Sequence, residues 1–147
     1  MKLCIQRVKE ASVTIENKEI SKIKKGLLVL LGISENDDES ISEGIIKKLY
    51  NLRIFEDENE KMNLSIKDVN GELLIVSQFT LYADCKNGNR PSFSKSADYN
   101  KAKKIYEDFI EKCRKFENIK VCTGEFGANM QVSLVNDGPV TIIFEND

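Results

Sequence analysis

The order of apolar runs along the chain constrains the fold more than any other feature of the sequence. Strand-like runs follow one another over most of the 147 residues, and only two segments have the spacing of an amphipathic helix. The strand candidates are 3–8, 11–15, 26–33, 51–55, 71–76, 119–122, 130–134 and 140–144. Strands that mostly follow strands are typical of an α+β domain. We therefore expect a largely antiparallel sheet or open β-barrel with two main helices packed on one side.

The two amphipathic segments should each cover part of that sheet. The first begins at the acidic run 37–39, which suits a helix N-terminus, and the second follows Ser96 or Asp98, either of which can cap a helix. The apolar stripes are Ile41, Ile45, Ile46 and Leu49 in the first, and Ala102, Ile105, Tyr106, Phe109 and Cys113 in the second. Because no linker or repeat divides the chain, residues 1–147 are expected to form a single domain.

The chain has no histidine, and this removes most familiar catalytic arrangements. Ser-His-Asp and Cys-His systems, a histidine general base and nearly every catalytic zinc site need an imidazole. The four cysteines form no CxxC pair, and we interpret them as core or incidental thiols. Any chemistry must use carboxylates, hydroxyls, backbone amides, a lysine or groups of the substrate itself.

Hydropathy and charge limit the partners. The apolar run 27–31 is far too short to span a bilayer, and charged residues interrupt the first fifteen positions, unlike a signal peptide. We therefore expect a cytoplasmic protein with no membrane contact. The formal net charge is −2, yet residues 84–104 hold six cations against two anions. This basic segment fits contact with nucleic-acid phosphates at one face, and equally an ordinary solvated helix face.

The sequence "NDGP" at 136–139 interrupts a strand-like pattern near the C-terminus. Alternating apolar residues precede it, a β-branched run follows it, and a proline cannot donate to a central strand ladder. All four residues favour turns, so one interpretation is a connection between two strands. The other is that Gly138 and Pro139 present rigid backbone groups to a ligand.

Polar residues also follow the buried strand candidate 71–76. Ser77, Gln78 and Thr80 stand where a rigid strand passes into a loop. A hydroxyl, an amide and nearby backbone N–H groups can hold a carbonyl there and stabilise an oxyanion. The alternative interpretation is a strand end whose side chains make ordinary hydrogen bonds.

Several stretches, taken together, resemble the D-aminoacyl-tRNA deacylases: "QRVKEASVTI", "GLLVLLGI", "NLRIFEDENEKMNLSIKDVNGELLIVSQFTLYADCKNGNRPSF" and "FGANMQVSLVNDGPVTI". The likeness runs from residue 1 to about residue 145, and the pairing of "SQFTLYAD" with "NDGPVT" is specific. It implies hydrolysis of the ester between a D-amino acid and the 3′-terminal adenosine of tRNA, and removal of glycine from tRNA for alanine. It also implies a homodimer with tRNA as its partner, with no metal or organic cofactor and no DNA.

The resemblance implies catalytic roles for Ser77, Gln78, Phe79 and Thr80. We expect water to attack the ester, with backbone N–H groups of Phe79 and Thr80 stabilising the oxyanion and the substrate's 2′-hydroxyl assisting. The competing route makes Thr80 a nucleophile, which requires a base that the neighbouring sequence does not obviously offer.

For Gly138 and Pro139, the resemblance implies a cis peptide bond and insertion into the pocket of the partner subunit. The two carbonyls of the dipeptide would then point the same way and could accept hydrogen bonds from the substrate's ammonium group. With the α-carbon so fixed, a D side chain points to solvent while an L side chain strikes the proline. Such a device works by exclusion and would accept glycine.

The basic residues Lys86, Arg90 and Lys95 follow the pocket motif. We expect them to bind phosphates of the tRNA acceptor stem without sequence specificity. Two other function classes stay open. One is a small-molecule esterase with Ser77 or Thr80 as nucleophile, and the other is a nucleic-acid-binding module without catalysis.

Overall fold

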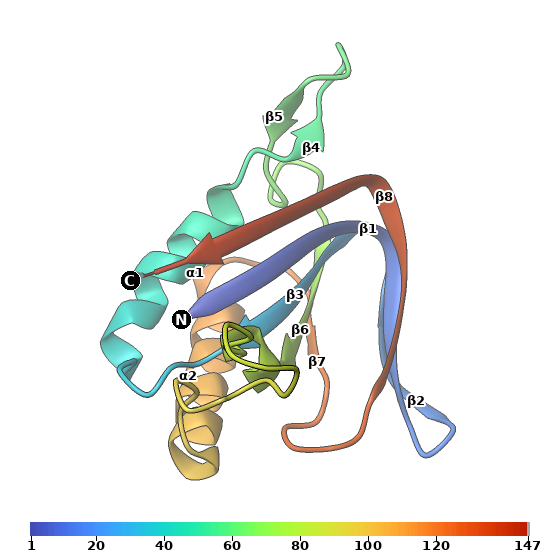
Figure 1. Ribbon diagram of the computed structural model, residues 1–147. Helices are drawn as coiled ribbons and strands as arrows, with labels where there is room; N and C mark the ends of the chain where they lie inside the picture. Colours follow the sequence, from blue (N-terminus) through green and yellow to red (C-terminus); the bar gives the residue numbers. More distant parts are fainter. Residues whose placement is uncertain (147) are drawn as a thin grey trace.

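The strands of the computed structural model form one curled sheet and a small hairpin, and both α-helices lie on one side of the sheet (Figure 1). The structure describes residues 1–146. The strands are β1 (Lys2–Ile15), β2 (Lys18–Ile23), β3 (Gly26–Gly32), β4 (Phe55–Glu56), β5 (Met62–Leu64), β6 (Glu72–Ser77), β7 (Val121–Thr123) and β8 (Gln131–Glu145). The helices are η1 (Glu39–Ile41), α1 (Ser42–Asn51), η2 (Phe79–Tyr82) and α2 (Tyr99–Phe116), where η marks a 3₁₀ helix. Within residues 1–146, no helix is long and apolar enough to cross a membrane.

The long strand β1 organises the sheet because it pairs along both of its edges. Its first half lies between β3 and the C-terminal half of β8, and its second half lies between β2 and the N-terminal half of β8. β3 pairs in turn with β6, and β6 with β7, so the order is β2-β1-β3-β6-β7 with β8 beside β1. β1 and β8 bend together (Figure 1), so the sheet curls until it is nearly closed.

The sheet is mixed, which corrects the expectation of a largely antiparallel one. β3 and β6 pair in parallel, and so do β6 and β7. α1 lies between β3 and β6 in the sequence, and α2 lies between β6 and β7. Parallel strands need such a crossover connection, whereas the strand patterns themselves do not report direction. The α+β class, with two main helices on one side of the sheet, is confirmed.

α2 begins where the sequence predicts, whereas at the first predicted helix start the 3₁₀ helix η1 forms and α1 follows it from Ser42. Before α1, Asp38 Oδ1 accepts a hydrogen bond from Ser40 N at 2.8 Å, and at the start of α2 Asp98 Oδ1 accepts one from Lys101 N at 3.0 Å. Satisfying such an N–H group stabilises a helix end by about 1 kcal/mol. All five apolar positions predicted for α2 are buried.

Two apolar clusters join the layers. The larger lies between the helices and the sheet, with Phe109 of α2 fully buried in it, and the smaller fills the inside of the curled sheet. β6 contributes to both, because alternate residues of a strand point to opposite faces. Leu73 and Ile75 belong to the larger cluster, and Leu74 and Val76 to the smaller. Burial of each such side chain contributes about 1.5–3 kcal/mol, so β6 is a firmly held strand.

The NDGP segment does not connect two strands, which corrects the turn interpretation. β8 continues through it and pairs with β1 on both sides. The register shifts between the pairs Gln6–Thr141 and Val8–Asn136, so the segment is a bulge in a continuous strand. Within residues 1–146, β8 pairs only with β1. A bulge in an edge strand is a place where a proline is tolerated.

The strand candidate 51–55 is wrong over most of its length, and two strand regions were not foreseen. α1 ends at Asn51, and β4 begins only at Phe55. β2 and the β4-β5 hairpin lie where the sequence predicts no complete strands. In β2 only Ile23 is fully buried, so the strand shows little of the alternation that identifies strands.

Candidate active site

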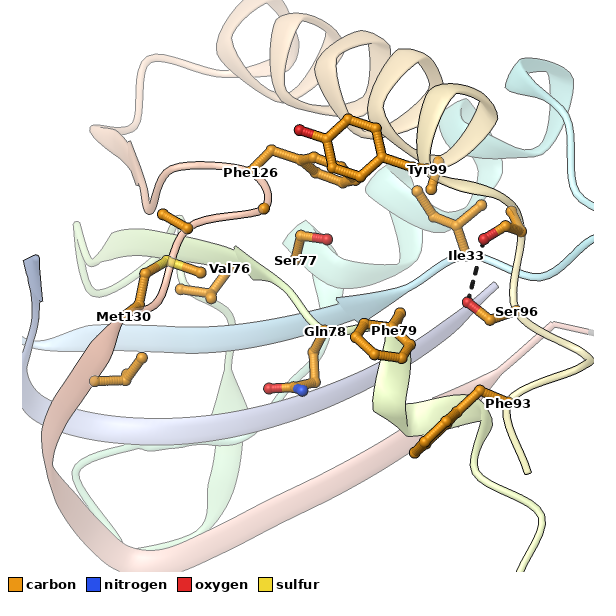
Figure 2. Close-up of a pocket in the computed structure, with 15 residues that line it drawn as sticks. Ile33, Val76, Ser77, Gln78, Phe79, Phe93, Ser96, Tyr99, Phe126 and Met130 are labelled. Carbon is orange, nitrogen blue, oxygen red and sulfur yellow. Dashed lines mark hydrogen bonds between the residues drawn. The ribbon is translucent and has the colours of Figure 1, made fainter. Parts of the chain in front are cut away.

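A cavity of about 620 Å³ opens at the carboxyl end of β6 (Figure 2). η2, the start of α2 and the loop between β7 and β8 surround it. Its walls are mainly apolar and aromatic, and the residues that matter most are Ser77, Gln78, Phe79, Phe93, Tyr99 and Phe126. A concave, mostly apolar space with a few polar groups is the usual form of a small-molecule site.

Ser77 and Gln78 place polar groups at this cavity. Ser77 is the last residue of β6, and its hydroxyl points into the cavity in Figure 2. Gln78 N donates a hydrogen bond to Leu31 O at 2.8 Å, which continues the hydrogen bonding between β3 and β6 past the end of the strand. The buried scaffold of β6 therefore sets the direction in which these two residues leave the sheet.

Thr80 lies beside the cavity and is not among the residues that line it. Its side chain is exposed, and Gln78 Nε2 donates a hydrogen bond to its hydroxyl oxygen. Among the described residues that line the cavity there is no carboxylate, lysine or cysteine. The cavity walls therefore offer no ordinary side-chain base for activating a hydroxyl nucleophile.

Aromatic side chains form two walls of the cavity, and of their four rings sequence reasoning named only Phe79. Phe79 and Phe93 meet edge to face, with ring centroids 5.1 Å apart, and Tyr99 and Phe126 do the same at 5.2 Å. Phe79 is 54% exposed, although large apolar side chains usually lie inside. Tyr99 lies outside the buried stripe of α2 and Phe126 in a loop, so no periodicity could identify them.

The wall containing Phe126 is supported from the protein interior by Tyr106 of α2. The two rings are 5.6 Å apart, and the Tyr106 hydroxyl donates a hydrogen bond to Ile75 O at 2.8 Å. Burial raises the pKa of Tyr106 well above its ordinary value. This phenol is therefore a neutral structural donor at ordinary pH.

Gly138 and Pro139 lie away from this cavity, on the bulge of β8, and both are exposed. The peptide bond between them is cis, as predicted. Gly138 has a φ of +130°, which L side chains rarely adopt. A Cβ at this position would lie 3.0 Å from Val140 Cγ2 and 3.2 Å from Arg7 Nη2. Within one chain, the structure does not bring the dipeptide together with the cavity.

Arg7 ties the bulge to the body of the protein, and sequence reasoning missed its role. It is only 4% exposed. Arg7 Nε donates a hydrogen bond to Asp137 O at 3.0 Å, and Nη1 donates one to Ile54 O at 2.8 Å. Carboxylates of Asp137 and Glu56 lie 3.7 and 3.6 Å from its guanidinium nitrogens. A buried guanidinium needs such partners because its desolvation is costly, and here they fix the backbone beside Gly138.

The basic residues Lys86, Arg90 and Lys95 are exposed on the segment between η2 and α2. Paired backbone hydrogen bonds between Asp84 and Ser92, at 2.8 and 2.9 Å, close the loop that carries Lys86 and Arg90. The backbone N–H of Lys86 donates to Asp84 Oδ1 at 3.0 Å and lowers the pKa of that carboxyl. Lys95 Nζ lies 3.7 Å from Asp84 Oδ2, so this carboxylate contacts both the backbone of Lys86 and the ammonium group of Lys95.

Comparison with known proteins defines the class. A family model described as D-Tyr-tRNA(Tyr) deacylase matches residues 4–145. The chain is 58% identical to the D-aminoacyl-tRNA deacylase of Thermosipho africanus, over 99% of this chain and 97% of the relative. It is 59% identical to the D-aminoacyl-tRNA deacylase of Finegoldia magna, over 99% and 98%. These matches over nearly the whole chain define an enzyme of the deacylase class.

Solved structures agree with the fold described above. One named c-Myc DNA Unwinding Element Binding Protein matches with a TM-score of 0.95 and 44% identity, covering 100% of this chain and 99% of that one. Another, a probable eukaryotic D-amino acid tRNA deacylase, matches with a TM-score of 0.83 over 97% of both chains, and at 16% identity it shows the fold alone. The chain belongs to the D-Tyr-tRNA(Tyr) deacylase family, which confirms the resemblance seen in its sequence.

Proposed function

We propose that this protein hydrolyses the ester bond between a D-amino acid and the 3′-terminal adenosine of tRNA, releasing the free amino acid and the tRNA. The observation that carries the proposal is the cavity at the end of β6, where Ser77 and Gln78 enter an otherwise largely apolar space in a chain of this family. Its volume of about 620 Å³ is typical of small-molecule sites and suits an aminoacyl group with its ribose. The enzyme would act in the cytoplasm, where aminoacyl-tRNA is used.

Attack by water fits the groups around the cavity. An aminoacyl ester is already activated, so the main requirement is a set of donors for the oxyanion that forms. Phe79 and Thr80 begin η2, and the first N–H groups of a helix have no acceptor within it. We assign these two N–H groups to the oxyanion and the substrate's 2′-hydroxyl to the proton transfer. Ser77 and Gln78 would position the ester.

Covalent attack by Thr80 is less favoured by the geometry. Its hydroxyl oxygen accepts a hydrogen bond from Gln78 Nε2, and an amide cannot serve as the base that such a nucleophile needs. The described walls of the cavity add no carboxylate, lysine or cysteine. Attack by water does not require the Thr80 side chain to take part in the reaction, and its hydroxyl only has to accept the hydrogen bond from Gln78.

A homodimer would complete the site. Gly138 and Pro139 are exposed and lie outside the cavity of their own chain. The outer edge of β8 has no partner strand within residues 1–146, and β8 carries the exposed apolar side chains of Val135 and Ile143. An unpaired strand edge with apolar side chains is a surface that a second copy can cover. We propose that each copy places its Gly138-Pro139 carbonyls in the cavity of its partner.

This arrangement would select substrates by exclusion. The dipeptide carbonyls would accept hydrogen bonds from the substrate's ammonium group while the ester lies at Ser77 and Gln78. The α-carbon then has one direction open to solvent, where a D side chain fits, and one blocked by Pro139, where an L side chain would clash. Glycine has no side chain to reject, so glycine attached to tRNA for alanine would also be removed.

Lys86, Arg90 and Lys95 would bind tRNA phosphates. All three are exposed on the segment between η2 and α2, which also carries Phe93 of the cavity wall. This supports the role, because cations that neutralise phosphates release counterions and give salt-dependent affinity. Each charge-removing substitution should therefore weaken tRNA binding and flatten its salt dependence.

One assay tests the proposal against its rivals. The protein is incubated separately with D-tyrosyl-tRNA, L-tyrosyl-tRNA, glycyl-tRNA for alanine and a simple activated ester, and loss of each ester is measured. We expect rapid loss of the D-tyrosyl and glycyl esters and retention of the L-tyrosyl ester. Equal loss of D and L forms would contradict the exclusion model. Turnover of the simple ester alone would indicate a general esterase, and tRNA binding without any ester loss would indicate a binding module.

A further inference from the structure

A second recess lies across η2 from the catalytic cavity. Its volume is about 330 Å³, and its lining includes Lys2, Tyr82, Asp84, Lys86, Lys95 and Glu145. η2 begins with Phe79, which lines the cavity, and ends with Tyr82, which lines the recess. The segment 93–96 is shared in the same way, since Phe93 lines the cavity and Lys95 lines the recess. The cavity and the recess are therefore neighbours, separated by a ridge that η2 and residues 93–96 form.

The ammonium group of Lys2 is fixed in this recess by the fold. Lys2 Nζ donates a hydrogen bond to Leu81 O at 3.3 Å and lies 5.0 Å from the centroid of the Tyr82 ring. Its side chain is 23% exposed, whereas a free surface lysine extends into solvent. A cation whose position is already set loses little side-chain entropy when an anion binds.

Among the described residues that line the recess, cations outnumber anions, and their ion pairs are loose. Lys2, Lys86 and Lys95 face two carboxylates, with Lys2 Nζ 3.3 Å from Glu145 and Lys95 Nζ 3.7 Å from Asp84. Ion pairs of this partly exposed kind contribute little to stability, so an incoming anion can replace them at small cost. A phosphodiester fits the recess in charge and size.

The ridge between the two hollows carries an exposed aromatic surface. Phe79 and Phe93 meet edge to face there, as Figure 2 shows. Aromatic side chains next to a basic groove are the combination that binds single-stranded nucleic acid, because bases stack on the rings while cations follow the backbone. η2 has four residues, so its length is about 8 Å, a distance that a nucleotide can bridge.

We propose that the recess of Lys2, Lys86 and Lys95 binds a phosphate of the unpaired CCA strand at the 3′ end of tRNA. This inference rests on the proposed function, since it requires the terminal adenosine to occupy the cavity. The nucleotide before that adenosine then crosses the ridge at Phe79 and Phe93, and its phosphate lies among the three lysines. The CCA strand is thus bound on both sides of η2, so the enzyme recognises the single-stranded 3′ end of the tRNA as well as its duplex stem.

The test compares three D-tyrosyl esters that differ only in RNA length: D-tyrosyl-adenosine, which has no phosphate, D-tyrosyl-CCA, and D-tyrosyl-tRNA. A triple variant, Lys2→Gln, Lys86→Gln and Lys95→Gln, is measured against the unchanged protein. We expect kcat/KM to fall about tenfold on D-tyrosyl-CCA and on D-tyrosyl-tRNA, with a smaller salt dependence, and to stay unchanged on D-tyrosyl-adenosine. The matched control changes three exposed lysines elsewhere, Lys18, Lys48 and Lys61, to Gln, and should leave all three rates within about twofold.

Each other outcome overturns the inference. A loss confined to D-tyrosyl-tRNA would place the lysines on the duplex stem. An equal loss on D-tyrosyl-adenosine would mean that the triple variant disturbs the cavity, and an equal loss in the control variant would mean that general charge attraction is responsible. Failure of the unchanged protein to hydrolyse any of the three esters would contradict the proposed function itself, which separates the two claims.

Discussion

The cavity at the end of β6 and the bulge of β8 are two parts of one proposed site, and they are positioned by opposite means. β6 is buried on both faces, and no charged side chain is needed to direct Ser77 into the cavity. The bulge is exposed, and the buried guanidinium of Arg7 ties its backbone to the chain at Ile54. An element held by many apolar contacts tolerates the loss of any one polar contact. Residues 137–140 of the bulge have no partner in the register of β1 and β8, so their backbone depends more on Arg7.

The largest effect is expected from Arg7→Ala. This change leaves the carbonyls of Asp137 and Ile54 without their donor and opens the space beneath the bulge, so the free energy of unfolding should fall by about 3 kcal/mol. Urea unfolding measures it. Arg53→Ala is the control, because Arg53 also donates two hydrogen bonds, to Asn63, but is exposed. Equal losses in the two variants would show that Arg7 does not hold the bulge in the way described.

A smaller effect is expected from Gly138→Ala. An alanine there must adopt a strained φ and approach Arg7 and Val140 closely, so stability should fall by about 1–2 kcal/mol, together with the rate on D-tyrosyl-tRNA. Gly44→Ala is the same substitution in helix α1, where a Cβ meets open space, and it should stabilise the protein by about 0.5–1 kcal/mol. Urea unfolding of both variants checks the opposite signs. A neutral Gly138→Ala would contradict a rigid bulge.

Alkaline pH should destabilise the fold through a buried thiol of the larger apolar cluster. Burial raises the pKa of the Cys113 thiol to about 12, from an ordinary value near 9. Between pH 9 and pH 10 the unfolded chain loses this proton while the folded chain keeps it. The free energy of unfolding should then fall by about 1 kcal/mol per pH unit as pH rises. Cys113→Ala should show a shallower slope in the same urea titration, and an unchanged slope would exclude the thiol as the cause.

The smallest effect is expected from Thr80→Val. The change removes the hydrogen bond from Gln78 but keeps the backbone N–H, so kcat on D-tyrosyl-tRNA should fall only about two- to fivefold. Single-turnover kinetics measure it, and circular dichroism checks that the variant is folded. A folded Thr80→Val variant with activity reduced by several orders of magnitude would instead support Thr80 as the nucleophile.

Local features of the fold could be predicted from the sequence because they depend on neighbouring residues. The caps Asp38 and Asp98 and the buried stripe of α2 follow from side-chain chemistry and a period of 3.6 residues. The parallel pairing of β6 could not be predicted in this way, since a strand pattern does not report the direction of its neighbour. The two apolar runs around NDGP likewise look alike whether the chain turns back or continues as one bulged strand.

The candidate site was only partly predictable for a similar reason. Ser77 and Gln78 were found because polar residues directly follow an apolar run, and the cis bond before Pro139 was expected from the family resemblance. Arg7 was missed because an arginine in a strand usually marks an exposed face, and only tertiary structure shows that this one is buried. Tyr99 was missed because it precedes the buried stripe of its helix.

The continuity of β8 determines which of the two active sites in the proposed dimer a substitution inactivates. One strand carries Val132, which lines the cavity of its own chain, and the Gly138-Pro139 dipeptide that would serve the other cavity. A substitution at Gly138 would therefore leave the active site of its own subunit intact and inactivate the active site of the partner subunit. A mixed dimer of Gly138→Ala and Ser77→Ala copies would keep one intact centre out of two, so co-expression of the two defective chains should restore part of the activity that each lacks alone.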